Sequence, residues 1–64
     1  MIRHSLQDLI QLEGRQVGIS LADGSRIDDC QLVFAGRDKV WVFVNGRDAF
    51  ISATRVSDFW ECRD

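Results

Sequence analysis

One stretch of the chain decides the fold: residues 17–46 read VGISLADGSRIDDCQLVFAGRDKVWVFVNG. Three turn signals divide this stretch at nearly even spacing, at Asp23-Gly24, residues 35–38 and Asn45-Gly46. Asn-Gly and Asp-Gly supply the positive φ angles of tight hairpins, and the Val, Ile, Phe and Trp between them favour strands. The stretch therefore predicts a meander of short antiparallel strands.

The strand before the first turn alternates cleanly. Val17, Ile19 and Leu21 are apolar, and the residues between them are small or polar. This alternation predicts one buried face. We also expect the helix or a neighbouring subunit to pack closely over the small residues.

The second strand, from about residue 25 to 34, changes hydrophobic phase within its length. Ile27 lies on one parity, and Cys30, Leu32 and Phe34 lie on the other. The Asp pair at 28–29 stands at the break. The change predicts a β-bulge or sharp bend that lets one strand serve both sheets of a small barrel. It also places Cys30 in the core.

Three further strands are expected at about residues 40–44, 49–53 and 56–62. The first reads VWVFV, which is typical of a strand covered on both faces, with its Val residues on one side. Neighbouring aromatic and apolar residues of the other two strands, such as Phe59 and Trp60, face opposite ways. A tight corner or 3-10 turn at Thr54-Arg55 joins those strands.

Residues 5–13 predict a short helix. Ser5 can cap it, Leu6, Leu9 and Ile10 share one face, and Gly14 ends it. A helix of this length is not stable alone in water, so its apolar face must dock on the sheet.

The composition fits one small domain over residues 1–64, with 45% apolar residues and a net charge of −2. A chain of this size buries only about 60% of its unfolded surface, so self-association would add stability. The charge lacks the basic balance usual for nucleic-acid binders. No signal-peptide pattern or membrane-spanning run is present, which favours a cytoplasmic location and reduced Cys30 and Cys62.

Catalytic and metal-binding chemistry has little support in the sequence. His4 is the single histidine, and neither cysteine has metal-ligand spacing. Asp28 and Asp29 are adjacent, so on a strand they point to opposite faces and fit a bulge better than an acid–base pair. We therefore expect a non-enzymatic protein with no cofactor and no metal.

Four aromatic residues give the best functional lead: Trp41, Phe43, Phe50 and Trp60. They cannot all point into so small a core, and exposed apolar surface on a small domain usually marks an interface. We expect them to bind a protein partner or a second copy of the chain, with open strand edges as the pairing route. The alternative is that the helix covers the second aromatic face completely.

Arg37, Lys39 and Arg55 form the candidate set for anions or nucleic acid. Alternate turns of a meander emerge at the same end, which groups Arg37 with Arg55, and Arg26 with Arg47. The alternative is that these arginines are solvated and neutralised by neighbouring Asp residues. A third alternative is a structural domain of a larger assembly, with no ligand of its own.

The chain resembles Sm-like and SH3-like small β-barrels over nearly its whole length. The likeness rests on a set of short matches in chain order: Leu12-Glu13-Gly14-Arg15, Val17-x-Ile19-x-Leu21-Ala22-Asp23-Gly24-Ser25, Cys30-x-Leu32, residues 40–44, Phe50-Ile51 and Val56. The resemblance implies a five-stranded barrel with a short N-terminal helix. Family RNA-binding residues lie in two loops, where only Arg55 and, loosely, Asp38 occupy comparable places. Small acidic Sm-like proteins that bind other proteins, such as bacterial inhibitors of the transcription terminator Rho, are similar at the same level.

Overall fold

The structure is a computed structural model that describes residues 6–62. Its elements are α1 (Leu6–Ile10), β1 (Gln16–Leu21), β2 (Arg26–Ala35), β3 (Lys39–Val44), β4 (Arg47–Ser52), the 3-10 turn η1 (Ala53–Arg55) and β5 (Val56–Glu61). The chain is mainly β, and each paired strand is antiparallel to its neighbours. The predicted meander and the predicted turn before the last strand are confirmed.

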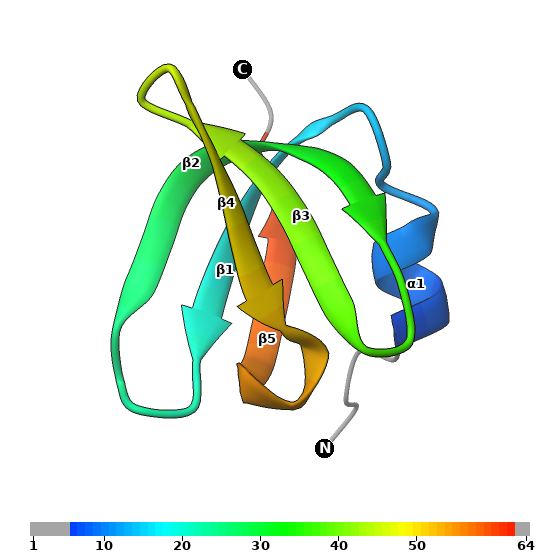
Figure 1. Cartoon of the computed structure of the whole chain (residues 1–64), viewed down its shortest axis with the longest axis vertical. Coiled ribbons are helices and arrows are strands. Elements are labelled where there is room, and N and C mark those ends of the chain that lie inside the picture. The colour runs from blue at the N-terminus through cyan, green and yellow to red at the C-terminus, as the bar shows by residue number, and fades with distance from the viewer. Residues whose placement is uncertain (1–5, 63–64) are drawn as a thin grey trace.

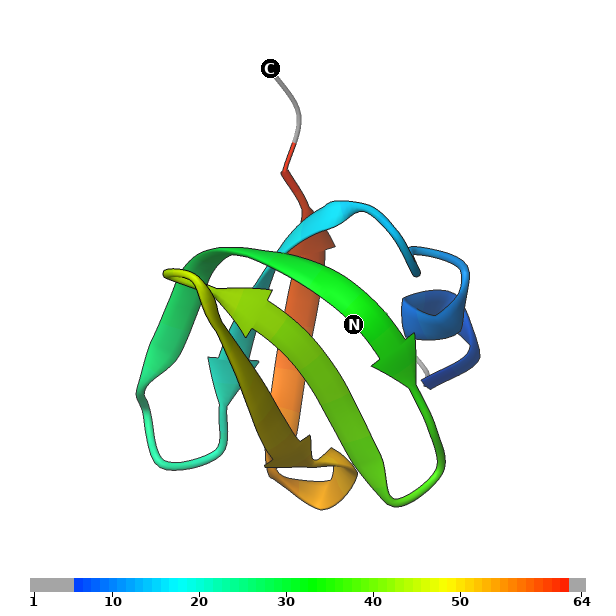
Figure 2. The same cartoon turned by 45° about the horizontal axis from the view of Figure 1, so that its top comes forward.

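The five strands form one sheet in the order β4-β3-β2-β1-β5. β2 is ten residues long and curves across the molecule, so the sheet wraps around its own core (Figure 1). Figure 2 shows β5 passing behind the β3–β4 hairpin. The sheet is open between β4 and β5, which are its two edges. The expected open edges are therefore present, and the structure shows a curved, open sheet.

The first irregularity of β2 is the predicted bulge at residues 28–29. Val17 is opposite Cys30 and Ile19 is opposite Ile27, so three steps along β2 match two along β1. The bulge resets the phase of the strand and lets Cys30, 2% exposed, point into the core.

A second bulge in β2 changes the prediction for Phe34. Leu32 is opposite Val42 and Phe34 is opposite Trp41, so Val33 is the extra residue. The phase shifts again, and Ala35 turns inward while Phe34 is 51% exposed. The expectation that Phe34 shares the buried face of Leu32 is therefore wrong.

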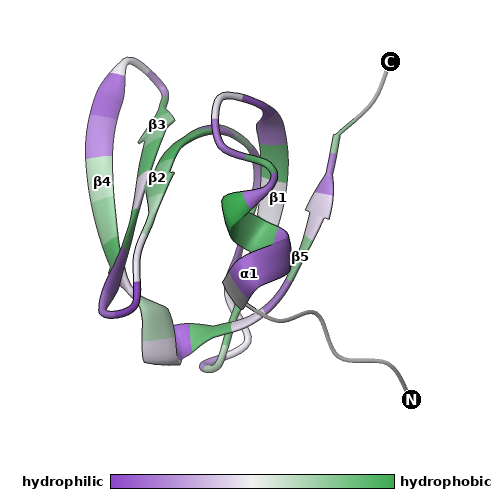
Figure 3. Cartoon of the chain, turned by 90° about the vertical axis from the view of Figure 1, so that its right-hand side faces the viewer, coloured by the Kyte–Doolittle hydropathy of each residue, from purple (hydrophilic) through white to green (hydrophobic). Residues whose placement is uncertain are grey.

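The core lies inside the curve of the sheet and consists of nine buried residues: Leu9, Val17, Ile19, Cys30, Leu32, Ala35, Val40, Val42 and Phe59. In Figure 3 hydrophobic colour runs along the strands and α1, and the connecting turns are mostly hydrophilic. β3 has the predicted two faces, with Val40 and Val42 buried. Its other face is not covered as expected, because Trp41 is only half-buried and Phe43 is 42% exposed.

The helix is shorter than the sequence predicts and docks differently. After Ile10 the chain forms turns, with Leu12 N–H donating to the Leu9 carbonyl at 2.9 Å. Leu9 is buried and Leu12 packs against the core, whereas Ile10 is 39% exposed. Gly14, with φ of 87°, ends the segment as predicted. The Ser5 cap and the Leu6 side chain lie outside the described part. Within residues 6–62 the one helix is far too short to cross a bilayer.

Candidate functional site

A row of three aromatic side chains crosses the outer face of the sheet. Phe34 on β2 is opposite Trp41 on β3, and Trp41 is opposite Phe50 on β4. The Trp41 and Phe50 rings pack together, with centroids 5.5 Å apart and an interplanar angle of 31°. Phe50 is 62% exposed. The row is therefore a continuous apolar strip facing solvent.

This row forms the floor of a surface hollow of about 300 Å³. The rim is the β2–β3 turn, residues 36–39, so we call this site the aromatic hollow: Phe34, Gly36, Arg37, Asp38, Lys39, Trp41 and Phe50. The structure thus brings together two of the predicted interface aromatics and two of the predicted cations. The volume suits one large side chain or a short peptide segment.

Gly36 sets the position of the Phe34 ring. A Cβ on Gly36 would lie 2.8 Å from Phe34 Cε2, so any larger residue there would push the Phe34 ring from this position. The turn itself is tied down, because Gly36 N–H donates to the Lys39 carbonyl and Ala53 N–H donates to the Asp38 carbonyl, each at 2.9 Å. The rim is therefore anchored by backbone hydrogen bonds.

Trp41 is oriented by a polar contact at its other end. Its indole Nε1–H donates to Asp48 Oδ1 at 3.0 Å. Lys39 Nζ lies 6.0 Å from the centroid of the Phe50 ring, at the outer limit for a cation–π contact. These contacts hold the floor in one arrangement with its apolar faces exposed.

The cations of the hollow differ from three of the four other arginines in the described chain. Arg15, Arg26 and Arg55 each form an ion pair with a carboxylate. Within residues 6–62, Arg37 and Lys39 form none. Their positive charges are thus available to a ligand.

Trp60, another predicted interface residue, lies on a different part of the sheet. Its indole lies against the backbone of Gly18, where any Cβ would overlap the ring. The guanidinium of Arg26 lies 5.5 Å from the Trp60 ring centroid. Close packing over the small residues of β1 is confirmed at Gly18, where the packing group is Trp60 and not the expected helix.

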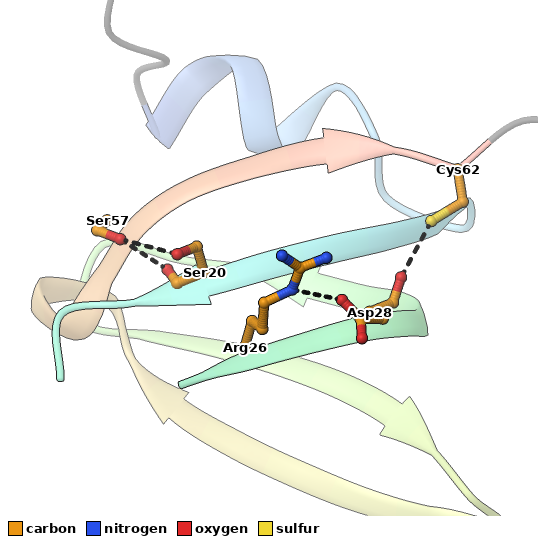
Figure 4. Close-up of polar contacts among 5 residues, drawn as sticks. All are labelled: Ser20, Arg26, Asp28, Ser57 and Cys62. Carbon is orange, nitrogen blue, oxygen red and sulfur yellow. Dashed lines mark hydrogen bonds and ion pairs between the residues drawn. The ribbon is translucent and has the colours of Figure 1, made fainter. Parts of the chain in front are cut away.

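Polar contacts surround the Trp60 region of the sheet, as Figure 4 shows. Arg26 Nε donates to Asp28 Oδ1 at 2.6 Å, and Ser57 Oγ donates to the Ser20 carbonyl at 3.1 Å. Cys62 Sγ lies 3.4 Å from the Asp28 carbonyl. These groups join β1, β2 and β5 through contacts within the chain.

Arg55 and Phe43 do not line the hollow. Arg55 Nη2 pairs with Asp23 Oδ2 at 3.1 Å, which joins η1 to the β1–β2 turn. The expected grouping of Arg26 with Arg47 is wrong, because curved β2 places the β1–β2 turn at the end opposite the β3–β4 hairpin (Figure 1). Phe43 is opposite Asp48, two residues along β3 from Trp41.

The thiols are poorly suited to nucleophilic chemistry. Burial, with a smaller contribution from the Asp29 carboxylate, raises the pKa of Cys30 to about 11. The pKa of Cys62 is also raised, by desolvation and by nearby Asp carboxylates. A raised thiol pKa lowers the thiolate fraction at neutral pH. Both cysteines are free, and no three His, Cys, Asp or Glu side chains of the described part cluster for a metal ion. His4 lies outside that part.

Comparisons of the chain with protein-family models, curated proteins and solved structures found no match. Fold and site together define a small, mainly β chain with two open sheet edges and an aromatic hollow.

Two residues of the hollow are missed by sequence reasoning, namely Phe34 and Gly36. Phe34 has the parity of the buried Cys30 and Leu32, and nothing in the alternation marks Val33 as a bulge. Gly36 reads as turn chemistry, whereas its role is to leave space for a ring. A small Ala-Gly pair directly after an aromatic residue is the one signal that was present.

Proposed function

We propose that this chain is a non-enzymatic interaction module that acts through protein–protein contacts and associates with itself through its open strands. In fold it would be an Sm-like or SH3-like small barrel whose β4 and β5 edges meet those of neighbouring copies. The observation that supports this most is the open sheet, because β4 and β5 both leave an edge without a partner strand. Unpaired edges are templates for adding a strand.

The distribution of apolar surface supports the same proposal. Phe43 is 42% exposed and lies on β3 outside the aromatic hollow, so it leaves apolar surface that contacts between copies would bury. A chain of 64 residues has a limited core, and strand pairing with further apolar burial would stabilise it.

A nucleic-acid function has less support. Its predicted cations were Arg37, Lys39 and Arg55, and Arg55 forms an ion pair with Asp23 and does not line the hollow. The chain also carries a net charge of −2. Phosphate backbones favour clusters of available cations, and two such groups form a small footprint.

A proline in β4 tests the pairing route. Ala53 N–H bonds to the Asp38 carbonyl, so strand alternation directs the N–H of neighbouring Ser52 away from β3. Ser52 has φ of −60°, which proline adopts without strain. We expect Ser52→Pro to weaken self-association about tenfold, as followed by sedimentation velocity over a concentration series.

Ser52→Ala is the matched control, because it removes the hydroxyl and keeps the N–H. We expect this variant to associate like the unmodified chain. Circular dichroism of both variants checks that the sheet is retained. Equal association of Ser52→Pro and Ser52→Ala, with folded protein in both cases, would contradict pairing through β4.

A further inference from the structure

The aromatic hollow lies on the face of the sheet, whereas self-association through β4 and β5 uses its edges. Edge pairing extends a sheet in its own plane and adds no layer above it. The hollow therefore stays open in an assembly built through the edges.

We propose that the aromatic hollow binds a short acidic segment of a different protein. One aromatic or large apolar side chain of that segment would fill the space over Trp41 and Phe50. Flanking carboxylates would pair with Arg37 and Lys39. The inference rests on the proposed function only in treating the chain as a protein-binding module.

Charge supports an acidic occupant. Arg37 and Lys39 border the hollow and make no ion pair with the described residues, although three other arginines do. Asp38 lies between them in the chain, so the turn carries one net positive charge. A carboxylate can meet the Arg37 guanidinium with two parallel hydrogen bonds, which gives geometry as well as attraction.

The site is also preorganised. The Val33 bulge directs Phe34 outward, Gly36 leaves space for its ring, and Asp48 fixes the Trp41 indole. A surface that is already ordered loses little conformational entropy when a ligand binds. Such an aromatic floor with a charged rim is typical of an anchor pocket for a peptide side chain.

The carboxylates around the hollow favour a peptide over nucleic acid. Asp38 is on the rim and Asp48 supports the floor, so a chain of phosphates would approach negative charge on two sides. A peptide with one apolar anchor and flanking carboxylates needs only the two cations. Nucleic-acid binding is therefore an outcome of the test that overturns the proposal.

The probe is the heptapeptide Gly-Ser-Asp-Phe-Asp-Ser-Gly, titrated into ¹⁵N-labelled protein and followed by two-dimensional NMR. We expect the indole N–H signal of Trp41 and the amides of residues 36–39 to shift, and the indole signal of Trp60 to stay. Two control peptides, one with Lys for every acidic residue and one with Ala for Phe, should produce no saturable shift.

Charge reversal tests the cationic rim. Arg37→Glu should weaken binding of the acidic peptide at least tenfold, and Phe50→Ala should weaken it comparably. Arg47→Glu is the matched control, because Arg47 is exposed, forms no ion pair within residues 6–62 and does not line the hollow. It should leave the affinity unchanged.

Three results with these peptides and variants would overturn the proposal. They are no shift of the Trp41 signal at millimolar peptide, equal binding of the lysine peptide, or equal weakening by Arg37→Glu and Arg47→Glu. Tighter binding of a ten-nucleotide oligothymidylate at the same signals, with steep salt dependence, would assign the hollow to nucleic acid instead. The molecular mass of each sample, measured in parallel, keeps a failure of peptide binding distinct from a failure of self-association.

Discussion

Gly18 and Gly36 show how single residues position the aromatic rings of this chain. Neither glycine has a positive φ, so backbone freedom does not explain them. Each instead leaves space for a ring, Trp60 over Gly18 and Phe34 over Gly36. Aromatic side chains thus lie close against the backbone of a glycine at two separate places.

Gly18→Ala should destabilise the fold by about 1–3 kcal/mol, because the new methyl group would overlap the Trp60 indole. Urea denaturation measures the free energy of unfolding. The same substitution in a Trp60→Ala background should cost much less, since the overlapping ring is gone. An equal loss in both backgrounds would show that the ring does not cause the effect.

Cys30 should make stability depend on alkaline pH. Burial raises its pKa from 9.0 to about 11, so the unfolded state releases the thiol proton first as the pH rises. The stability that the buried, protonated Cys30 thiol contributes is fully present below about pH 9. This stability is lost as the pH rises through about 11. The urea midpoint of the unmodified chain should fall over this pH range. The midpoint of the Cys30→Ala variant should fall less steeply. If the urea midpoints of the two proteins fell equally with pH, Cys30 would not be the cause of the alkaline loss of stability.

At the level of elements, the two bulges of β2 decide which side chains are available. The first bulge returns Cys30 and Leu32 to the core, and the second sends Phe34 out to the hollow. A single ten-residue strand thereby supplies both core residues and Phe34, which is part of the floor of the aromatic hollow.

Alanine substitutions in β2 should separate these two roles. Leu32 is fully buried, so Leu32→Ala should cost about 2–5 kcal/mol. Phe34 is half-exposed, so Phe34→Ala should cost less than about 1 kcal/mol while weakening binding of the acidic peptide. Chemical denaturation compares the two variants. A larger loss for Phe34→Ala would place that ring in the core and contradict the second bulge.

Local patterns in the sequence predict the elements well. Asn45 and Gly46 have φ of 55° and 76°, as the Asn-Gly turn requires, and the phase change at residues 28–29 corresponds to a bulge. The helix was less predictable, because Leu12 packs on the core in place of Ile10 once the chain leaves helical geometry. The spacing of apolar residues does not show at which residue a short helix ends, because its length depends on its tertiary contacts.

The site was predictable only in part. Composition and alternation single out Trp41, Phe50, Arg37 and Lys39, and cross-strand register brings them together. The Val33 bulge, which adds Phe34, depends on pairing with β3 and leaves no trace in the alternation. The position of Trp60 was likewise not predictable, because its indole packs against Gly18 only once β1 and β5 are paired.

On the scale of the whole molecule, the open sheet separates two ways of making contacts. In our proposals the edges pair between copies, and the aromatic hollow, on the face of the sheet, binds another protein. Both could be used at once, so an assembly would present several hollows. Repeated weak sites of this kind raise the overall affinity for a multivalent partner.

The most direct test of the central claim is the solution mass of the purified chain, measured by light scattering at low and high salt. Contacts made by strand pairing and apolar burial are weakly screened, so we predict a defined oligomer that persists at high salt. A clean monomer of 7.3 kDa under both conditions would contradict self-association. The aromatic hollow would then be the one proposed interaction surface.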